Sequence, residues 1–345
     1  MKKLVLGVSL LFSSIFCINA QDGFENILLA DVNDSQKLLQ AYFAPGMEGF
    51  INSMNNGWAH TAKAHKVFGF DLSFGVSGSM IPSDRETFNI AALGLTSVSS
   101  SSSTAQTFGG RNIETQMTVN TTINGQNATA SFNFPGGIKD ELPLDAVPAP
   151  FVQFTLGLPG KIDAMLRLVP KTSFGEDEGS INLLGFGLKK EITSWFGPMD
   201  KTPLHVALMA AYTKMDVNYA ISDSPDPDFT AQNAATSFDL SAFTVQAIAS
   251  LNFPVINLYG GFGYNSGNAS FNMAGNFTGT YDTGLPAPND TITQTLNVPS
   301  NIDFDSSGFR TSFGARLSLG FFKIFADYTI HEFNSLTAGI AFSFR

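Results

Sequence analysis

Apolar and polar residues alternate along the C-terminal residues 306–345. Phe313 and Leu317 belong to the apolar set, whereas Arg310 and Arg316 belong to the interleaved polar set. The alternation occurs in three successive segments of this region. A repeat of two residues is that of a β-strand, in which successive side chains point to opposite faces. The pattern therefore predicts three antiparallel strands, each with one apolar face and one polar face.

Length and context indicate that these strands cross a membrane, although a soluble β-sandwich alternates in the same way. Each run has the length of a tilted membrane-spanning strand, about ten residues. Phe325 is the one large apolar residue on the polar side. The final strand ends at Phe344, next to Arg345, and so resembles the C-terminal strand of bacterial outer-membrane barrels, which typically finishes on or beside a phenylalanine.

Seven earlier segments alternate in the same way, so we expect an all-β fold: an antiparallel transmembrane β-barrel of about ten strands. The count rises to twelve or more if residues 81–148 hide a hairpin of the wall; Asn124-Gly125 predicts a hairpin turn there. Bacterial barrels have short turns at one end and long loops at the other. The seven segments are residues 67–80, 150–158, 162–168, 184–188, 204–212, 243–251 and 256–264. The tight turns are at 159–160, 253–254 and 320–322, and the long loops are 81–148, 221–234 and 273–306.

The N-terminal part differs from the rest. Residues 1–20 have the basic start and apolar core of a secretory signal peptide; lipid anchoring at Cys17 is an alternative that the preceding bulky residue disfavours. Residues 21–63 predict a short helix capped by Asn33 or Asp34, a break at Pro45, and a second short helix. We expect them to plug the barrel or to cap it on the periplasmic side, because the apolar face of the helix needs a partner.

Composition is consistent with this interpretation. The chain has 345 residues, with 33 Phe and 32 Gly, and only 14% are charged. No run after residue 20 approaches the roughly 18 apolar residues of a spanning helix, so a membrane location requires a barrel. The formal charge of −10 becomes −12 when the two signal lysines are removed. Such acidity disfavours nucleic acid as a partner and leaves outer-membrane lipid and a small-molecule ligand; the oligomeric state is open.

No catalytic, nucleotide or metal motif stands out, so we expect neither an enzyme nor a cofactor. Four scattered histidines and no cysteine in the mature chain make a zinc site improbable. His331 and Glu332 are similar to the acid–base pair of outer-membrane proteases, but any barrel places such residues at its rim. An enzyme at the rim is therefore the least favoured hypothesis.

The candidate functional residues are the charges on the inward faces of the strands. They pair with one another and with the plug in a filled lumen, or they line a path for a solute; the sequence favours neither. These lumen-lining candidates are Asp71, Asp163, Arg167, Lys171, Lys189, Arg310, Arg316, Lys323 and Asp327.

Four motifs carry a family resemblance: NNGW at residues 55–58, KVFGFDL at 66–72, LGLT at 93–96 and GFGLKKEITSW at 185–195. With them the chain resembles an uncharacterised family of exported bacterial outer-membrane β-barrel proteins. In architecture it is also similar to the long-chain fatty-acid transporters of the outer membrane. The resemblance implies a barrel in the outer membrane but no substrate. We expect a protein that passes or binds a small, hydrophobic molecule; the alternative is a surface barrel whose loops 81–148 and 273–306 bind a partner.

Overall fold

The computed structural model describes residues 24–174, 179–221, 228–299 and 301–344. The predicted signal peptide lies outside the described residues.

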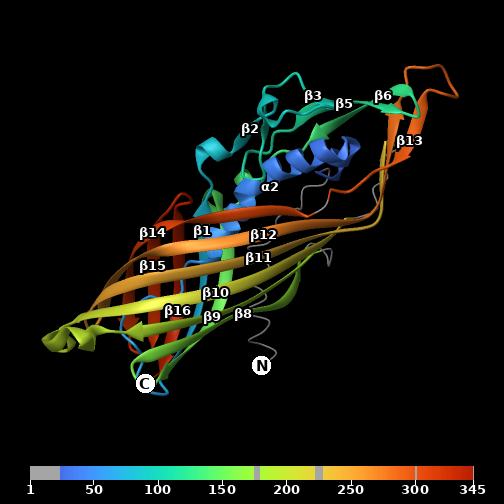
Figure 1. Cartoon of the computed structure of the whole chain (residues 1–345). Helices are drawn as coiled ribbons and strands as arrows, with labels where there is room; N and C mark the ends of the chain where they lie inside the picture. The colour runs from blue at the N-terminus through green and yellow to red at the C-terminus, as the bar shows by residue number, and fades with distance from the viewer. Residues whose placement is uncertain (1–23, 175–178, 222–227, 300, 345) are drawn as a thin grey trace.

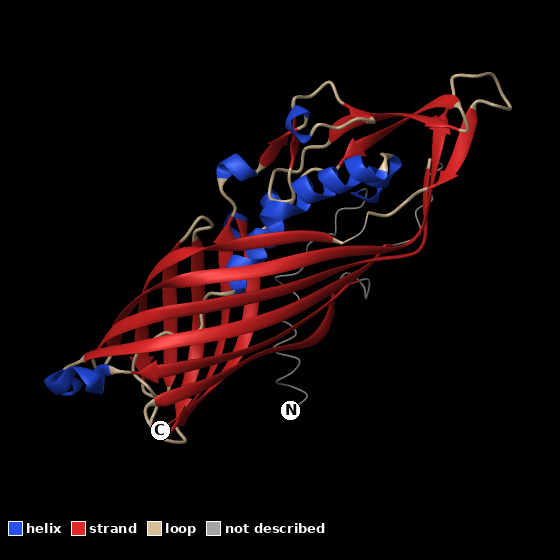
Figure 2. Ribbon diagram, viewed as in Figure 1, coloured by secondary structure: helices blue, strands red, loops and turns tan. Residues whose placement is uncertain are grey.

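Ten antiparallel strands close into a barrel (Figures 1 and 2). Each strand pairs with the next in the ring, β11 pairs with β12, and β1 joins β16 with Phe70 opposite Phe344. This confirms the predicted barrel and its ten strands. In ring order they are β1 (Phe70–Met80), β7 (Ala146–Leu158), β8 (Ile162–Phe174), β9 (Gly179–Glu191), β10 (Leu204–Ile221), β11 (Phe229–Asn252), β12 (Ile256–Asp282), β14 (Ile302–Leu319), β15 (Phe322–Ile330) and β16 (Ser335–Phe344).

The two ends of the barrel differ. The turn end carries the C-terminal strand end and tight turns, in which Gly160 and Gly320 adopt the positive φ angles of 81° and 67°. The loop end carries the long connections, with the short elements η2 (Ser83–Arg85), β2 (Thr87–Asn89), η3 (Ala91–Leu93), β3 (Val98–Ser99), β4 (Thr104–Gln106), β5 (Thr115–Ile123), β6 (Gln126–Phe134), η4 (Lys139–Glu141), η5 (Pro143–Asp145) and β13 (Thr291–Thr295). A further 3-10 segment, η6 (Thr193–Lys201), joins β9 to β10 at the turn end.

The outward faces of the ring are apolar near the turn end. Phe70, Phe313 and Ile340 are 37%, 59% and 37% exposed and lie on the outside of the barrel rather than in a core. Exposed apolar side chains on successive strands form the lipid-facing band of an outer-membrane-type barrel. None of the helices in the described residues is both long and apolar enough to cross a membrane.

Four strands extend far past this band: β10, β11, β12 and β14. β12 has 27 residues, a length of about 90 Å at 3.3 Å per residue, whereas β15 has only nine. β12 continues to Asp282 and β14 begins at Ile302, so the connection between them is shorter than the expected loop 273–306. Along these extensions the alternation changes sides: Asp303 faces outward, whereas Phe271 and Phe304 are buried inside.

A single α-helix, α2 (Val32–Met54), fills the loop end of the lumen, preceded by η1 (Phe24–Leu29). It lies away from the C-terminus (Figure 1) and contacts β14, β7, β1, β12 and β11. The prediction of two short helices broken at Pro45 is wrong, because Pro45 lies inside α2. Its cost of about 3 kcal/mol is offset by the burial of apolar residues on both sides of it, such as Tyr42 and Ile51. The cap is Asp31, one position before the helix, and not Asn33 or Asp34.

The segment between β1 and β7 covers α2 and adds no strand to the ring. Its β5–β6 hairpin turns at Asn124-Gly125, as predicted. Asp34 of α2, fully buried, accepts hydrogen bonds from the backbone N–H groups of Thr96 and Ser97 at 2.8 and 2.7 Å. The hairpin pairs with the far end of β12, where Thr129 lies opposite Asp282, but it does not enter the ring, which keeps the predicted ten strands.

Candidate functional site

Residues 55–66, which we call the lumen segment, run through the barrel from the loop end to the turn end. At the loop end, Ser53 Oγ lies 2.8 Å from Ser79 Oγ of β1. At the turn end, the N–H of Phe68 donates to the carbonyl of Gly157 at 2.8 Å, and β1 begins directly afterwards. We call residues 24–66 the plug. Its last part, residues 55–66, lies inside the barrel.

Arg167 of β8 fixes the start of the lumen segment. Its guanidinium is 1% exposed and lies between the rings of Trp58 and Phe151, at 4.0 and 4.1 Å from their centroids. It donates from Nη1 to the carbonyls of Met54 and Asn56 at 3.2 and 3.0 Å. A desolvated cation between two aromatic faces is stabilised by their quadrupoles, so Arg167 binds a ring and the main chain of the plug together.

Two arginines of β14 hold the opposite side of the segment. Arg310 Nη1 donates to the carbonyl of Asn55 at 2.8 Å, and Arg316 Nη1 lies 2.9 Å from Nδ1 of His60. An arginine nitrogen only donates, so His60 accepts this bond through Nδ1. The ring of His60 also stacks on Phe325, with centroids 4.8 Å apart. Phe325, which looked out of place in the sequence, is thus a lumen residue that packs on the plug.

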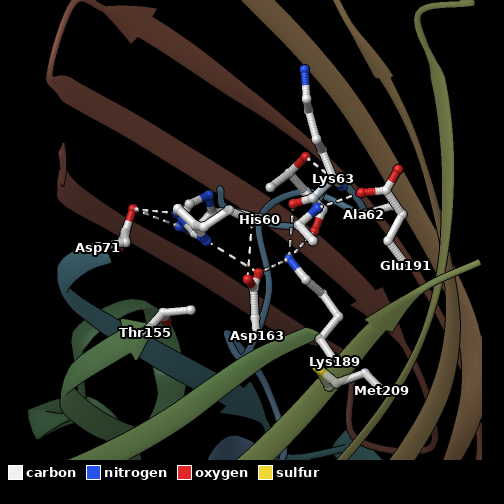
Figure 3. A network of polar contacts seen from close by, with 12 residues as sticks. His60, Ala62, Lys63, Asp71, Thr155, Asp163, Lys189, Glu191 and Met209 are labelled. Carbon is white, nitrogen blue, oxygen red and sulfur yellow. Dashed lines mark hydrogen bonds and ion pairs between the residues drawn. The ribbon is translucent and has the colours of Figure 1, made fainter. Parts of the chain in front are cut away.

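An ion-paired cluster surrounds the middle of the segment (Figure 3). Asp163 of β8 accepts from Lys189 Nζ at 2.9 Å and lies 3.1 Å from Nδ1 of His65. Asp71 of β1 lies 3.7 Å from Nε2 of His60 and 4.0 Å from Nε2 of His65. His65 therefore lies between two carboxylates of the wall, whereas His60 lies between Asp71 and Arg316. The charges of Asp163 and Lys189 are paired rather than directed at open solvent.

Glycines of β9 make room for the one tryptophan of the segment. A Cβ atom on Gly187 would lie 3.1 Å from Cε3 of Trp58, and one on Gly185 would lie 3.0 Å from its Cη2. Trp58 is 2% exposed and packs with Met165 of β8 and Ile248 of β11. The motifs at residues 55–58 and 185–195, which carried the family resemblance, thus meet inside the lumen.

Seven of the nine candidate lumen charges are buried inside the barrel: Asp71, Asp163, Arg167, Lys189, Arg310, Arg316 and Asp327. Lys171 is exposed and lies within the bulge between Val169 and Thr172 of β8. Lys323 is half-buried at the turn end, where its Nζ donates to the carbonyl of Gly320 at 2.6 Å.

Sequence reasoning missed several wall residues of this site. Glu191 and His205 form a buried pair at 2.8 Å, and Gln153 donates to the carbonyl of Trp58 at 3.0 Å. Glu191 belongs to the motif at residues 185–195, but the expected strand ended at residue 188, whereas β9 continues to Glu191. Its position two residues after Lys189 on the same face of β9 was the available signal.

Within the described part of the chain, no group of three or more His, Cys, Asp and Glu residues could hold a metal ion. At the rim, Glu332 accepts from Arg85 Nη1 at 3.0 Å, and His331 packs beside Gly308.

The comparisons with known proteins place the chain in a family but assign it no activity. The model of a family of unknown function (DUF6588) matches residues 1–344. A search of curated proteins gave no match.

Among solved structures, the chain is similar to Ail, the attachment invasion locus protein of Yersinia pestis, with 8% identity and a TM-score of 0.25 over 81% of this chain and 100% of Ail. It is also similar to the translocator domain of the autotransporter NalP from Neisseria meningitidis, with 10% identity and a TM-score of 0.27 over 81% of this chain and 89% of that one. The ferric citrate transporter FecA gives 10% identity and a TM-score of 0.27 over 81% of this chain and 39% of FecA. Similarities this low carry no argument about function.

Proposed function

The chain belongs to this family of unknown function, and we propose that it is an outer-membrane barrel that admits a small hydrophobic or amphipathic molecule into the loop end of its lumen. The plug is the gate of this path. The observation that carries the proposal is the division of the lumen into an apolar chamber filled by α2 and a polar section filled by the lumen segment.

The chamber is lined by apolar side chains of the extended strands. The ring of Phe43, on α2, lies 5.3 and 5.1 Å from the rings of Phe238 and Phe271. Leu240 and Phe304, also buried, belong to the same core. These contacts are non-covalent, so withdrawal of α2 would expose a chamber that an apolar solute can enter, with a gain of about 25 cal/mol per Å² of apolar area it covers.

A reversible lock on the plug tests the gate. Ser53 and Ser79 have hydroxyl oxygens 2.8 Å apart, and the only cysteine of the natural chain, Cys17, precedes the plug. In S53C/S79C an oxidised disulfide ties α2 to β1. We expect oxidation to reduce binding of the fluorescent probe N-phenyl-1-naphthylamine, and conductance in planar bilayers, to background, and we expect reduction to restore both.

The matched control is S79C/S335C. Ser79 and Ser335 also have hydroxyl oxygens 2.8 Å apart, but both belong to the wall, so this disulfide leaves the plug free. Equal probe binding by oxidised and reduced S53C/S79C would show that the plug is no gate. Absence of both binding and conductance in the reduced protein would contradict passage or binding of a small molecule.

The extensions of β11, β12 and β14 favour a second candidate, a surface barrel that binds a partner. They present a polar outer face beyond the apolar band, with Asp239, Asn268 and Asp303 exposed. Replacing residues 284–299 by a short Gly-Ser linker removes β13 and leaves the ring intact. Loss of cell-surface attachment, with unchanged heat-modifiable mobility on gels, would support this function; unchanged attachment would count against it.

A further inference from the structure

The wall side chains that reach the lumen segment bind mainly its backbone. On the carbonyl side, Lys189 Nζ donates to Thr61 and Lys63 at 3.0 and 3.2 Å. Arg167, Arg310 and Gln153 supply the other carbonyl contacts described above. Side-chain donors of the wall therefore bind carbonyls at several positions between residue 54, at the end of α2, and residue 63.

Acceptors of the wall follow the N–H groups in the same way. The N–H of Ala62 donates to Ser250 Oγ at 3.0 Å, and that of Ala64 donates to Glu191 Oε2 at 2.8 Å. The N–H of His65 donates to Asp163 Oδ1 at 3.0 Å. These acceptors come from β11, β9 and β8, so three different strands accept hydrogen bonds from one stretch of backbone.

We propose that the polar section of the lumen is a binding site for polypeptide main chain in an irregular, bent conformation, which a second polypeptide can occupy when residues 55–66 withdraw. Backbone N–H and C=O groups are the same in every residue except proline. A site that satisfies them accepts many sequences, provided that the side chains fit. The segment indicates that small side chains are needed at several positions, because it has glycine or alanine at Gly57, Ala59, Ala62 and Ala64.

The proposal goes beyond the gated entry of a small molecule and does not depend on it. Side chains of the segment add contacts to the wall, but these belong to the protein's own segment and stabilise it against competitors; they come from Trp58, His60, Thr61 and His65. Hydrogen bonds to charged partners are stronger than those between neutral groups, so the main-chain contacts favour binding of another chain that follows the same path.

A cut in the folded, full-length protein tests this site. A protease sequence inserted between Lys66 and Val67 lies at the turn end, where Val67 and Phe68 are 42% and 69% exposed. Cleavage leaves residues 24–66 held by non-covalent contacts alone. We expect the cut plug to remain with the barrel on size-exclusion chromatography and to exchange with excess labelled peptide of residues 52–66. Immediate loss of the cut plug, or failure to exchange at any peptide concentration, would overturn the proposal.

Four competitor peptides separate main-chain from side-chain recognition. One changes Lys63 and Lys66, whose side chains make no hydrogen bond or ion pair with the wall; we expect its affinity to stay within about three-fold of the native peptide. One is N-methylated at Ala62 and Ala64, which removes donors to Ser250 and Glu191 and should weaken binding at least about ten-fold. N-methylation at Lys63, whose N–H donates to Thr61 within the segment, is the control. The fourth is an unrelated Gly-Ala-Ser peptide of equal length. Binding of the native peptide alone, or equal affinity of the two N-methylated forms, would contradict main-chain recognition.

Discussion

At the scale of single residues, one guanidinium, that of Arg167, makes three contacts with the plug. It is buried, donates to two carbonyls of the plug, and separates two aromatic rings. Lysine carries the same charge but lacks the planar fork, so Arg167→Lys is not conservative here.

We therefore expect Arg167→Ala to loosen the plug by about 2–4 kcal/mol, because two carbonyls lose their donor in a buried site. The measurement is the rate at which a maleimide labels Ser53→Cys, which is 1% exposed when the plug is docked. A rise of about two orders of magnitude is expected, with Arg167→Lys in between. Lys214→Ala, at an exposed site on the outer wall, should leave the rate unchanged. An unaltered labelling rate in Arg167→Ala would show that the arginine does not hold the plug.

At the scale of elements, the strands were predictable where they contact lipid and not where they leave it. In β10, Leu208 and Tyr212 give an outward apolar stripe, but further along the same face carries Lys214 and Asp216, and the apolar side becomes the inward one. The phase of the alternation therefore inverts within one strand. A search for outward apolar residues stops at this inversion, which explains why β10, β11 and β12 were predicted too short.

For the helix, the sequence predicted a break that the structure does not have. Pro45 and Gly46 predict a break from local propensity, but burial in the chamber overrides the propensity, so two predicted helices are one. The lumen charges were recognised from alternation alone, whereas their partners on the plug depend on a path through the barrel that no local pattern encodes.

The N-terminus of α2 gives a pH-dependent prediction. Burial alone would raise the pKa of Asp31, but hydrogen bonds from Asp34, Ser97, Asn33 and Thr96 outweigh it and lower the pKa below the ordinary 3.8. A lowered pKa in the folded state means that the cap stabilises α2 fully above pH 3.8 and loses this effect as pH falls through the lowered value. Asp31→Ala should cost about 1 kcal/mol, seen as roughly five-fold faster hydrogen exchange of the first-turn amides at pH 7. Equal exchange rates for the variant and the natural protein at pH 7 would contradict this role.

At the scale of the whole molecule, the wall encloses a balanced set of buried charges. Its basic members are Arg167, Lys189, Arg310 and Arg316, and its acidic members are Asp71, Asp163, Glu191 and Asp327. The formal charges of these eight wall residues therefore cancel. The protein's net charge of −10 must reside elsewhere, and exposed carboxylates beyond the lipid-facing band, such as Asp303 and Asp305, contribute to it.

The opposite faces of the wall give the last prediction. Phe313 of β14 points outward and is 59% exposed, while Ser312 beside it points into the lumen. Phe313→Arg places a charge in hydrocarbon and should destabilise the barrel in lipid by about 2–4 kcal/mol near the bilayer midplane. Asn268→Arg, on the outward face of the β12 extension, adds the same side chain above the apolar band and should cost little. The measurement is the urea midpoint of unfolding in lipid vesicles, followed by heat-modifiable gel mobility. Equal midpoints for the two variants would mean that Phe313 does not contact lipid, and the assignment of the apolar band to the membrane would then fail.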